Sequence, residues 1–490
     1  MMQVYLAIDL GAGSGRLVAG KYDGATLQLE EIHRFSNEGV EINGGYYWDT
    51  PRIFANVTEG IQKAIEKYGD RVVSVATDSW GCDFALLDCQ GNVLGGHRQY
   101  RDPRIEGMQQ AMNERIPLNE VFAHTGIQPA FYNSSLHLLA ESIKGNPCFS
   151  IADRLLFTPD LLAFWLSGVR ANERTITSTS QLYNPIARDW AWEVIDALGL
   201  PREMFGNIVS SGTVLGPLTD GMAEKTGATH GMKVVASAGH DTASAVAGLP
   251  MERGGLWLSS GTWSILGVES EQPVTTTEAF EAKLSNEGGV NKTTRLLHNV
   301  SGLWIIQECR REWAEQGEEM SYAELARLAE EAEPFTAFID PNDPTFASPG
   351  DMPGKIRAFC KKTGQSVPES KGRILRIATD SLALKYRQVI EVLGKVTGRT
   401  FDALNAGGGG IQNELLMQAT ADAIGIPVIA GPTEATSCGN IITQMVATGE
   451  LPDITAGRKL VAASMESKTF TPSASSVWQP HYEKFLTLIH

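Results

Sequence analysis

The sequence has no long apolar run, no basic N-terminal segment and no excess of basic residues. Without about 18 consecutive apolar residues, a conventional membrane span is not expected. Without a basic start followed by an apolar run, we expect no signal peptide and therefore a cytoplasmic protein. Because 57 acidic residues outnumber 41 basic ones, giving a formal net charge of −16, neither nucleic acid nor a membrane surface is an expected partner.

Cysteines are few, and their spacing is unlike that of a metal site. The six cysteines are scattered along the chain without a CxxC pair, so we expect no zinc site. Reduced thiols in the cytosol are the default for such a pattern. If the substrate is anionic, glycine N–H groups and a metal ion must hold it, because basic residues are scarce.

The chain is too long for one hydrophobic core. Its 490 residues with 42% hydrophobic content exceed what a single core usually supports, so two large domains are expected. We place them at residues 1–245 and 246–490.

The most informative stretch is residues 9–16, where an apolar strand ends in Asp9, turns through three glycines and resumes as a second strand. Glycine tolerates positive φ and lacks a Cβ, so backbone N–H groups can converge on phosphate while Asp9 faces a hydrated magnesium ion. Taken alone, a tight hairpin with a solvated aspartate fits equally well. Residues 255–268 repeat the strand–turn–strand pattern, which predicts two related halves that hold one nucleotide.

Two further predicted strands end in polar residues. Residues 71–77 lead to Asp78 and Asp83, which could read sugar hydroxyls or could simply cap a loop. Residues 233–237 lead to His240 and Asp241 near the expected domain junction, where clefts often bind ligands. A helix-capping role for Asp241 and a buried structural role for His240 remain alternatives.

The rest of the chain gives coarser predictions. Residues 26–34 are expected to form a strand, and residues 312–372 look like a charged, proline-rich insertion on the surface. The glycines of residues 407–410 would let an adenine or a ribose lie against the backbone. Gly439 is expected to permit close packing of a helix, and residues 478–490 to form a terminal amphipathic helix.

Seven motifs occur in an order that resembles the FGGY carbohydrate kinases, over nearly the whole chain. They are Asp-Leu-Gly-Ala-Gly-Ser-Gly-Arg, Asp-Ser-Trp-Gly-Cys-Asp-Phe, Tyr-Arg-Asp, Gly-His-Asp-Thr-Ala-Ser, Ser-Ser-Gly-Thr-Trp-Ser, Asn-Glu-Gly-Gly and a glycine run before Gln-Asn. The resemblance implies an α/β protein with two actin/Hsp70/hexokinase-like (ribonuclease H-like) domains and an interdomain cleft. It also implies a mixed five-stranded sheet flanked by helices in each domain. By the same resemblance, residues 1–245 would bind the sugar and the phosphate and carry the catalytic base near their end, and residues 246–490 would bind the nucleotide.

The resemblance also implies roles for particular residues. Asp241 would be the general base that takes the proton of the attacking hydroxyl. The residues expected to bind the sugar are Gly81, His240, Asp241, Thr242 and Asn299. The residues expected to bind ATP are Ala12, Gly13, Ser14, Gly15, Arg16, Thr262, Gln307 and Gly409. Asp9 would hold Mg²⁺ through water, as the cofactor that accompanies ATP.

The expected partners are a small-molecule ketose and ATP, and the expected state is a monomer or a small homo-oligomer. Within the family the motifs favour ATP-dependent phosphorylation of L-rhamnulose on O1, which gives L-rhamnulose 1-phosphate and ADP in L-rhamnose degradation. L-Fuculose or another ketose is the nearest alternative, because Ser79 and Cys82 stand where Thr and Val are commoner in the family. An actin- or Hsp70-type ATPase switch is the alternative from a different class.

Overall fold

The computed structural model describes residues 2–473 and 475–489. The residues outside this description are Met1, Ala474 and His490. His490 is the last residue of the expected terminal helix. The chain forms two units, each assembled from three stretches. The first unit comprises Met1–Gly254, Glu269–Leu296 and Ala435–Met465, and the second comprises Gly255–Val268, Leu297–Glu434 and Glu466–His490. The functional boundary expected at residues 245/246 stays a prediction.

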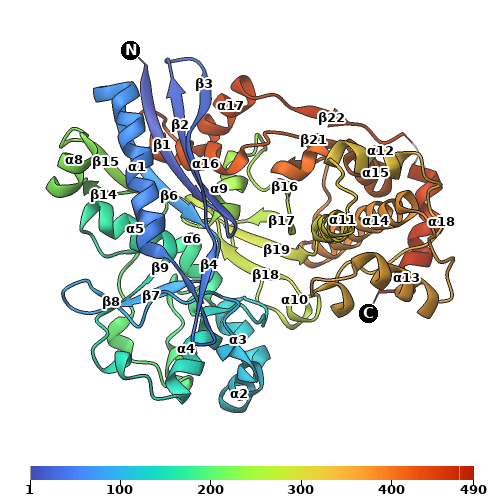
Figure 1. Cartoon of the computed structure of the whole chain (residues 1–490), viewed down its shortest axis with the longest axis horizontal. Helices are drawn as coiled ribbons and strands as arrows, with labels where there is room; N and C mark the ends of the chain where they lie inside the picture. The colour runs from blue at the N-terminus through green and yellow to red at the C-terminus, as the bar shows by residue number, and fades with distance from the viewer. Residues whose placement is uncertain (1, 474, 490) are drawn as a thin grey trace. The chain divides into compact units, whose positions relative to one another are not determined.

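The first unit is built on a mixed sheet (Figure 1) with the strand order β14-β15-β6-β1-β2-β3. Its strands are β1 (Gln3–Leu10), β2 (Ser14–Tyr22), β3 (Leu27–Ser36), β6 (Val72–Ser79), β14 (Thr213–Pro217) and β15 (Lys233–Ala236). The strands expected near residues 26–34, 71–77 and 233–237 are confirmed. The expected count of five strands is wrong, because β14 adds an antiparallel sixth strand beside β15.

Both faces of β1 are covered, which explains its continuous apolar run. Leu6 and Ile8 face one hydrophobic cluster, together with the helix α1 (Thr50–Tyr68). Tyr5 and Ala7 face the other, together with α9 (Asp241–Gly248) and α16 (Ala435–Ala447). Alternation with a period of two, apolar on both faces, is typical of a central strand between helical layers.

Smaller elements complete the first unit. Its other helices are α2 (Met108–Arg115), α3 (Leu118–Thr125), α4 (Ser134–Ile143), α5 (Thr158–Ser167), α6 (Arg174–Thr177), α7 (Trp192–Ala197), α8 (Asp220–Thr226), α10 (Thr277–Glu281) and α17 (Ile454–Ser464). Its short strands are β4 (Gly39–Ile42), β5 (Gly45–Trp48), β7 (Phe84–Leu87), β8 (Val93–Leu94), β9 (Arg154–Phe157), β10 (Asn172–Glu173), β11 (Tyr183–Asn184), β12 (Asp189–Trp190), β13 (Ile208–Val209) and β18 (Ser285–Gly288).

The second unit contains six strands of a second mixed sheet, which has the strand order β18-β19-β17-β16-β20-β21-β22, so five strands is again too few. These are β16 (Leu256–Ser260), β17 (Ser264–Ser270), β19 (Thr294–Val300), β20 (Leu404–Gly407), β21 (Val428–Ala430) and β22 (Lys468–Phe470). The helices are α11 (Trp304–Glu315), α12 (Tyr322–Glu330), α13 (Met352–Lys362), α14 (Lys371–Thr397), α15 (Glu414–Ile424) and α18 (Ser475–Leu486).

The expectation of a surface insertion at residues 312–372 is wrong. Helices α12 and α13 and the loop between them place Phe346, Met352 and Ile356 in a fully buried cluster with α11 and α14. Most charged residues of α12 and α13 are exposed or half-buried, which is why the average composition suggested a surface segment. The terminal helix α18 is confirmed, with Trp478 and Phe485 buried.

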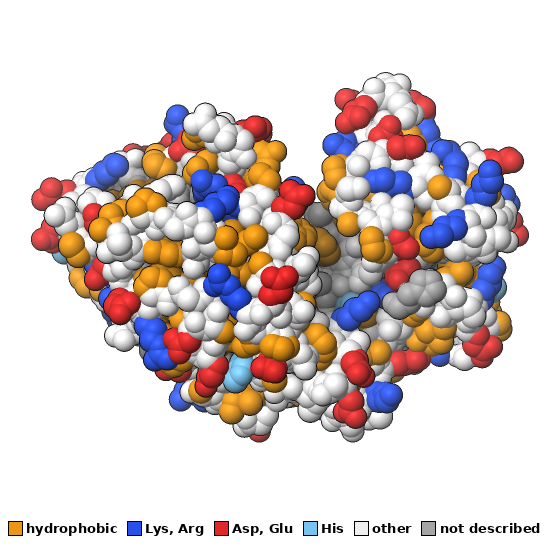
Figure 2. All heavy atoms as spheres, turned by 90° about the horizontal axis from the view of Figure 1, so that it is seen from below, with side chains coloured by type: hydrophobic (Ala, Val, Ile, Leu, Met, Phe, Trp, Pro, Cys, Tyr) orange, Lys and Arg blue, Asp and Glu red, His pale blue; other side chains and the backbone are white. Residues whose placement is uncertain are grey.

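The exposed surface mixes charges of both signs, as the face seen in Figure 2 shows, where red and blue side chains are interspersed.

Among the helices of the described residues, none combines the length and the apolar character that crossing a bilayer requires.

His97 connects α1 to α5 inside the first unit. Its Nδ1 lies 2.8 Å from the hydroxyl of Thr50, and its Nε2 lies 3.3 Å from that of Thr158. Burial, helped by the positive charge of Arg104, lowers the pKa of His97 to about 3. The folded protein therefore holds this imidazole neutral at pH values where an unfolded chain would protonate it.

We predict that this buried histidine makes the fold sensitive to mild acid. Above pH 6.5, the unperturbed pKa, His97 is neutral in both the folded and the unfolded protein, so it costs no stability. As the pH falls toward 3, only the unfolded chain protonates this histidine, so the free energy of unfolding decreases. At pH 5 the loss amounts to about 2 kcal/mol. Urea unfolding at pH 7.5 and pH 5 should therefore show a smaller pH dependence for His97→Gln than for the wild type. His230→Gln, at an exposed site, is the control. An equal decrease in the free energy of unfolding between pH 7.5 and pH 5 for all three proteins would contradict the prediction.

Candidate active site

The first glycine hairpin folds an arginine back over its aspartate. Asp9 and Arg16 are cross-strand partners in β1 and β2, and the Arg16 Nη2 lies 2.7 Å from the Asp9 Oδ2. Ala12, Gly13 and Ser14 are exposed at the turn, and a Cβ on Gly13 would meet no atom within 4 Å. The turn therefore has an exposed backbone edge with open space beside Gly13.

Gly15 is glycine for a different reason, because a Cβ there would lie 2.4 Å from the ring of Phe35. A larger residue at position 15 would therefore have to displace the ring of Phe35, its cross-strand partner in β3. The ATP-binding role predicted for residues 12–16 stays a prediction.

Asp78 is the second-last residue of β6 and lies beside Asp9, with which it is in register. Its side chain is fully buried, its Oδ2 accepts a hydrogen bond from Asn440, and its Oδ1 has no hydrogen-bond partner among the described residues. Burial, and then the negative charge of Asp9, raises the pKa of Asp78 well above its ordinary value. A cation near Asp9 would relieve this repulsion.

Among the described residues, no group of three or more His, Cys, Asp or Glu side chains is placed to hold a metal ion. Mg²⁺ commonly takes only one or two protein carboxylates and completes its shell with water and substrate phosphates. Asp9 and Asp78, with one unsatisfied carboxylate oxygen, fit that mode of binding. The assignment of Asp9 to magnesium stays a prediction.

Asp241 is the first residue of α9 and follows the loop after β15. Its Oδ1 accepts hydrogen bonds from the backbone N–H and the hydroxyl of Thr242, the latter at 3.0 Å. The Nδ1 of His240 lies 3.0 Å from the same oxygen. These contacts orient one carboxylate oxygen of a side chain that is 34% exposed, and the role of Asp241 as a base stays a prediction.

His240 lies between two carboxylates. Its Nε2 is 3.4 Å from the Oε2 of Glu287, which in turn lies 2.8 Å from the Nη2 of the fully buried Arg295. Burial alone would lower the pKa of His240, but Asp241 and Glu287 raise it to about 9. Burial would raise the pKa of Glu287, but Arg295 and His240 lower it to about 2.

Glu173 anchors the loop that carries these residues. Its buried Oε2 accepts hydrogen bonds from the N–H of Thr175 at 2.8 Å, from the Thr175 hydroxyl, and from the N–H of Gly239 at 3.0 Å. The Thr175 hydroxyl also accepts from the N–H of His240 at 3.2 Å. The backbone just before Asp241 is thereby tied to the start of α6.

Near the strand end at residues 78–84, one aspartate holds two tryptophan side chains. Trp48 and Trp80 both donate from Nε1 to the Asp83 Oδ2, at 2.6 and 2.8 Å, and their ring centroids lie 4.3 Å apart. Burial raises the pKa of Asp83 to about 7. Asp83 therefore orients two indoles, and Gly81, predicted to bind sugar, follows Trp80 and packs against Thr179.

In the second unit, three predicted nucleotide residues from distant parts of the sequence line one cavity of about 570 Å³. Its wall includes Thr262, Leu303, Gln307, Tyr322, Leu375, Gly409 and Asn413. Apolar walls with a few amides are typical of small-ligand sites of this size. The roles of Thr262, Gln307 and Gly409 stay predictions, but the structure brings the three together.

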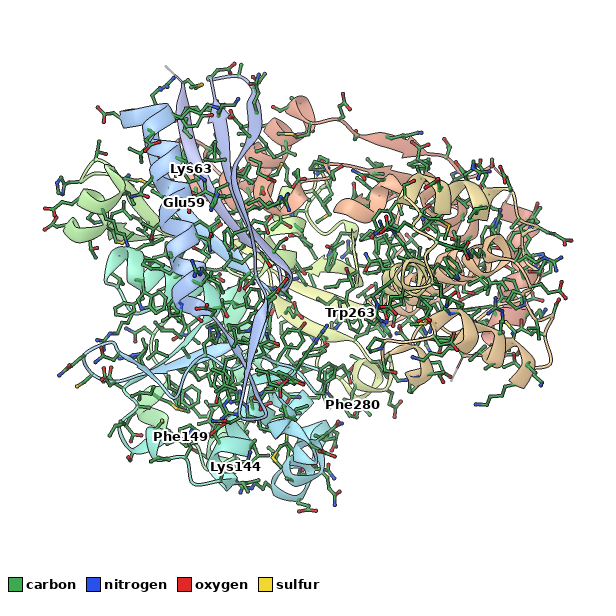
Figure 3. The ribbon with its side chains drawn as sticks, viewed as in Figure 1. Glu59, Lys63, Lys144, Phe149, Trp263 and Phe280 are labelled. Carbon is green, nitrogen blue, oxygen red and sulfur yellow. The ribbon has the colours of Figure 1, made fainter. Side chains whose placement is uncertain are left out.

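Local hydrogen bonds explain how the cavity forms. In the turn between β16 and β17, the carbonyl oxygen of Gly261 accepts a hydrogen bond from the N–H of Leu303 at 3.1 Å. The carbonyl oxygen of Thr262 accepts one from the N–H of Trp304, the first residue of α11, at 3.0 Å. Trp263, at the tip of this turn, is half exposed (Figure 3). Asn299, predicted to contact sugar, lies in β19 of this unit, and its carbonyl oxygen accepts from Asn342.

The glycines that follow β20 are glycine for different reasons. Gly408 has φ +89, and a Cβ on Gly410 would lie 2.2 Å from the Ser260 Oγ. A Cβ on Gly409 would meet no atom within 4 Å. Two of these glycines are therefore required by the fold, whereas Gly409 leaves open space where a ligand could lie.

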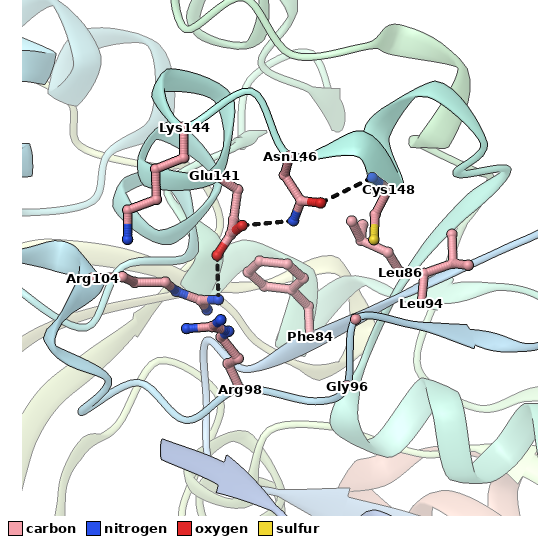
Figure 4. Close-up of a pocket in the computed structure, with 11 residues that line it drawn as sticks. Phe84, Leu86, Leu94, Gly96, Arg98, Arg104, Glu141, Lys144, Asn146 and Cys148 are labelled. Atoms are coloured by element: carbon pink, nitrogen blue, oxygen red, sulfur yellow. Dashed lines mark hydrogen bonds and ion pairs between the residues drawn. The ribbon is translucent and has the colours of Figure 1, made fainter. Parts of the chain in front are cut away.

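A separate cavity of about 300 Å³ lies in the first unit and contains none of the sequence-predicted site residues (Figure 4). Its wall combines Phe84 with charged residues, and Arg104 donates to Glu141 at 2.9 Å. Glu141 also accepts from Asn146. Arg104, Glu141 and Asn146 therefore form hydrogen bonds with one another in the wall of this cavity.

Sequence reasoning missed Glu173, Arg295 and the role of Glu287. Glu173 acts on a loop 66 positions away in the chain, so no local pattern could have linked them. Glu287 stood in a recognised motif, Asn-Glu-Gly-Gly, whose glycines allow close contacts with Arg174 and Thr293. Arg295 stands beside Leu296 and Leu297 in β19, but the sequence alone does not show that it is buried or that Glu287 is its partner.

The chain belongs to the FGGY family of carbohydrate kinases: residues 4–248 match the N-terminal domain of the family and residues 256–448 its C-terminal domain. It is therefore a sugar kinase with the two-domain, actin/hexokinase-like α/β fold that the sequence predicted. The chain is 42% identical over 486 residues to the rhamnulokinase of Bacteroides thetaiotaomicron, covering 99% of both chains. It is 37% identical to the rhamnulokinase of Enterococcus faecalis, covering 99% of this chain and 97% of that one.

Two solved structures share the fold at low sequence identity. The gluconate kinase from Lactobacillus acidophilus superposes with a TM-score of 0.83 at 15% identity, covering 100% of this chain and 98% of that one. The ligand-bound xylulose kinase from the same organism also gives 0.83, at 16% identity, with 99% and 97% covered. These similarities concern the fold alone.

Proposed function

We propose that the protein transfers the γ-phosphoryl group of ATP to O1 of L-rhamnulose, giving L-rhamnulose 1-phosphate and ADP. The observation that carries this proposal is the similarity to relatives named rhamnulokinase along nearly the full chain. The protein would act in the cytoplasm as a monomer or a small homo-oligomer, in the degradation of L-rhamnose.

In the proposed mechanism, Asp241 accepts the proton of the attacking O1 hydroxyl. The donors on its Oδ1 keep the carboxylate in one orientation, so that Oδ2 can receive the sugar hydroxyl. General-base assistance of this kind contributes about 10²- to 10⁴-fold to the rate. His240, Thr242, Gly81 and Asn299 are the proposed sugar contacts.

Thr262, Gln307 and Gly409, which line the cavity of the second unit, are the proposed nucleotide contacts of that unit. In the first unit, residues 12–16 of the glycine turn are the proposed phosphate contacts. Phosphoryl transfer passes through a loose transition state and depends mainly on alignment and charge neutralisation. Magnesium supplies part of that neutralisation when it is bound, and Asp9 is the proposed contact through water.

The test is an assay of ADP release over L-rhamnulose, L-fuculose, L-xylulose, L-ribulose and glycerol, with and without Mg²⁺. We expect the highest kcat/KM with L-rhamnulose and no turnover without the metal. A preference for L-fuculose would transfer the proposal to that ketose and would point to Ser79 and Cys82. ADP release that does not depend on any sugar would instead support an ATPase switch and would overturn the kinase proposal.

The cavity assignment gives a prediction for Gly409. The Cβ of a valine at this position would meet no protein atom within 4 Å, so Gly409→Val should fold normally. It should raise the KM for ATP by about tenfold or more while leaving the KM for the sugar unchanged. Gly231→Val is the matched control, because a Cβ there also meets nothing within 4 Å. An unchanged KM for ATP would remove Gly409 from the nucleotide site.

A further inference from the structure

Glu287 has no part in the proposed mechanism, although the structure holds it next to the proposed base. Its partner Arg295 is fully buried and donates from Nε to the carbonyl of Gly288 at 2.9 Å and from Nη2 to Glu287 at 2.8 Å. A buried ion pair of this kind must offset the loss of hydration of both ions and often adds little net stability. Its presence at this place points to a role other than stability.

The geometry links Glu287 to Asp241 through a single ring. The Glu287 Oε2 lies 3.4 Å from the Nε2 of His240, and the Nδ1 of the same ring lies 3.0 Å from the Asp241 Oδ1. A neutral imidazole donates from only one nitrogen, whereas an imidazolium donates from both. Both contacts therefore act as hydrogen bonds together only when the ring is protonated.

The charged groups around His240 favour that protonated ring. Asp241 precedes the rest of α9, Glu287 comes from β18, and Arg295 in β19 reaches the ring only through Glu287. On the remaining sides, Glu173 binds the N–H of Gly239, and Asp78 precedes Ser79, whose carbonyl oxygen is 3.4 Å from Nδ1. Against the effect of burial, these surroundings raise the pKa of His240 to about 9.

We propose that Glu287 is a positioning residue for phosphoryl transfer: it fixes the ring of His240, and through that ring it fixes the carboxylate of Asp241 toward the sugar hydroxyl. The inference rests on the proposed function, since it concerns the same transfer step. Arg295 keeps Glu287 ionised and in place, so Arg295, Glu287, His240 and Asp241 form one chain of alternating charge.

The experiment compares Glu287→Gln with the wild type in two measurements. The first is kcat against pH with L-rhamnulose at saturating ATP. The wild type should keep its rate to about pH 9, whereas the variant should lose about tenfold in kcat at neutral pH and decline at a pH at least about one unit lower. The KM for ATP should stay within about twofold. The second is an NMR titration of the His240 ring without substrate, which should show the same downward shift.

Controls separate this role from simple loss of structure. Glu269→Gln removes a carboxylate from a similarly buried pair with Arg458, whose Nη1 lies 3.0 Å from it, and should leave the pH profile unchanged. Glu287→Gln combined with Arg295→Met removes the unpaired buried cation, restoring the fold if the single variant is unstable, and should still show the shift. Glu287→Asp, which keeps a carboxylate, should recover part of the rate.

A folded Glu287→Gln variant with the wild-type rate, pH profile and His240 titration would overturn the inference, as would a wild-type profile in the double variant. Because the titration needs no sugar, failure of this inference is distinguishable from failure of the proposed function. Wild-type protein that does not phosphorylate L-rhamnulose refutes the latter, whereas an unshifted His240 refutes only the role of Glu287.

Discussion

Asp241→Asn should lower kcat by about 10² or more while sugar and nucleotide affinities stay close to those of the wild type. Asparagine is nearly isosteric with aspartate, and its carbonyl oxygen can still accept the hydrogen bonds that Thr242 and His240 now donate. The amide group in place of the second oxygen, however, cannot take a proton from the sugar. Binding should therefore survive while proton removal is lost.

Single-turnover kinetics with saturating ATP and L-rhamnulose, together with calorimetric titration of each ligand, would measure this separation. Asp220→Asn is the matched control, because Asp220 is also the first residue of a helix, α8, and its side chain is 92% exposed. The control should be indistinguishable from the wild type. Turnover of Asp241→Asn equal to that of the wild type would remove Asp241 from the base role.

The parts of the site that could be predicted from sequence are those that one strand and its turn determine. In β1 and β2, apolar alternation and the glycines of residues 11–15 specify a hairpin without reference to the rest of the chain. The same holds for β16 and β17 around Thr262. These elements lie where the sequence placed them because their determinants are a few residues apart.

What the sequence could not supply is the set of contacts between distant stretches. Glu173 meets Gly239, and Glu287 meets His240, and each pair depends on how several elements pack. Asp78 and Asp83 show the same limit. Both were expected just after a strand, yet Asp83 proves to orient Trp48 and Trp80, and Asp78 lies within β6, buried beside Asp9.

The misjudged stretch at residues 312–372 has a related cause. Its apolar residues are spaced at helical intervals among many charges, so its average composition is that of a surface segment. Only the packed helices show that Leu325, Phe346 and Ile356 point inward together. Periodicity carries more information than composition where a helix covers a core.

The role predicted for Gly439 is confirmed by the packing of α16 against α9, and it leads to the second large expected effect. A Cβ on Gly439 would lie 1.7 Å from the carbonyl oxygen of Ser244, and a Cβ on Gly248 would lie 2.2 Å from that of Ala435. The two helix backbones are therefore in direct contact. No rotamer change can relieve such a clash, since the opposing atoms belong to the main chain.

Gly439→Ala should therefore lower the free energy of unfolding by about 3 kcal/mol, at the upper end of overpacking effects. Because α9 begins with Asp241, the displaced helix should also lower kcat. The matched control is Gly221→Ala in α8, where a Cβ meets nothing within 4 Å and where alanine should be neutral or stabilising by about 0.5–1 kcal/mol. Urea unfolding measures both variants, and equal stability of Gly439→Ala and the wild type would contradict the close contact of α9 and α16.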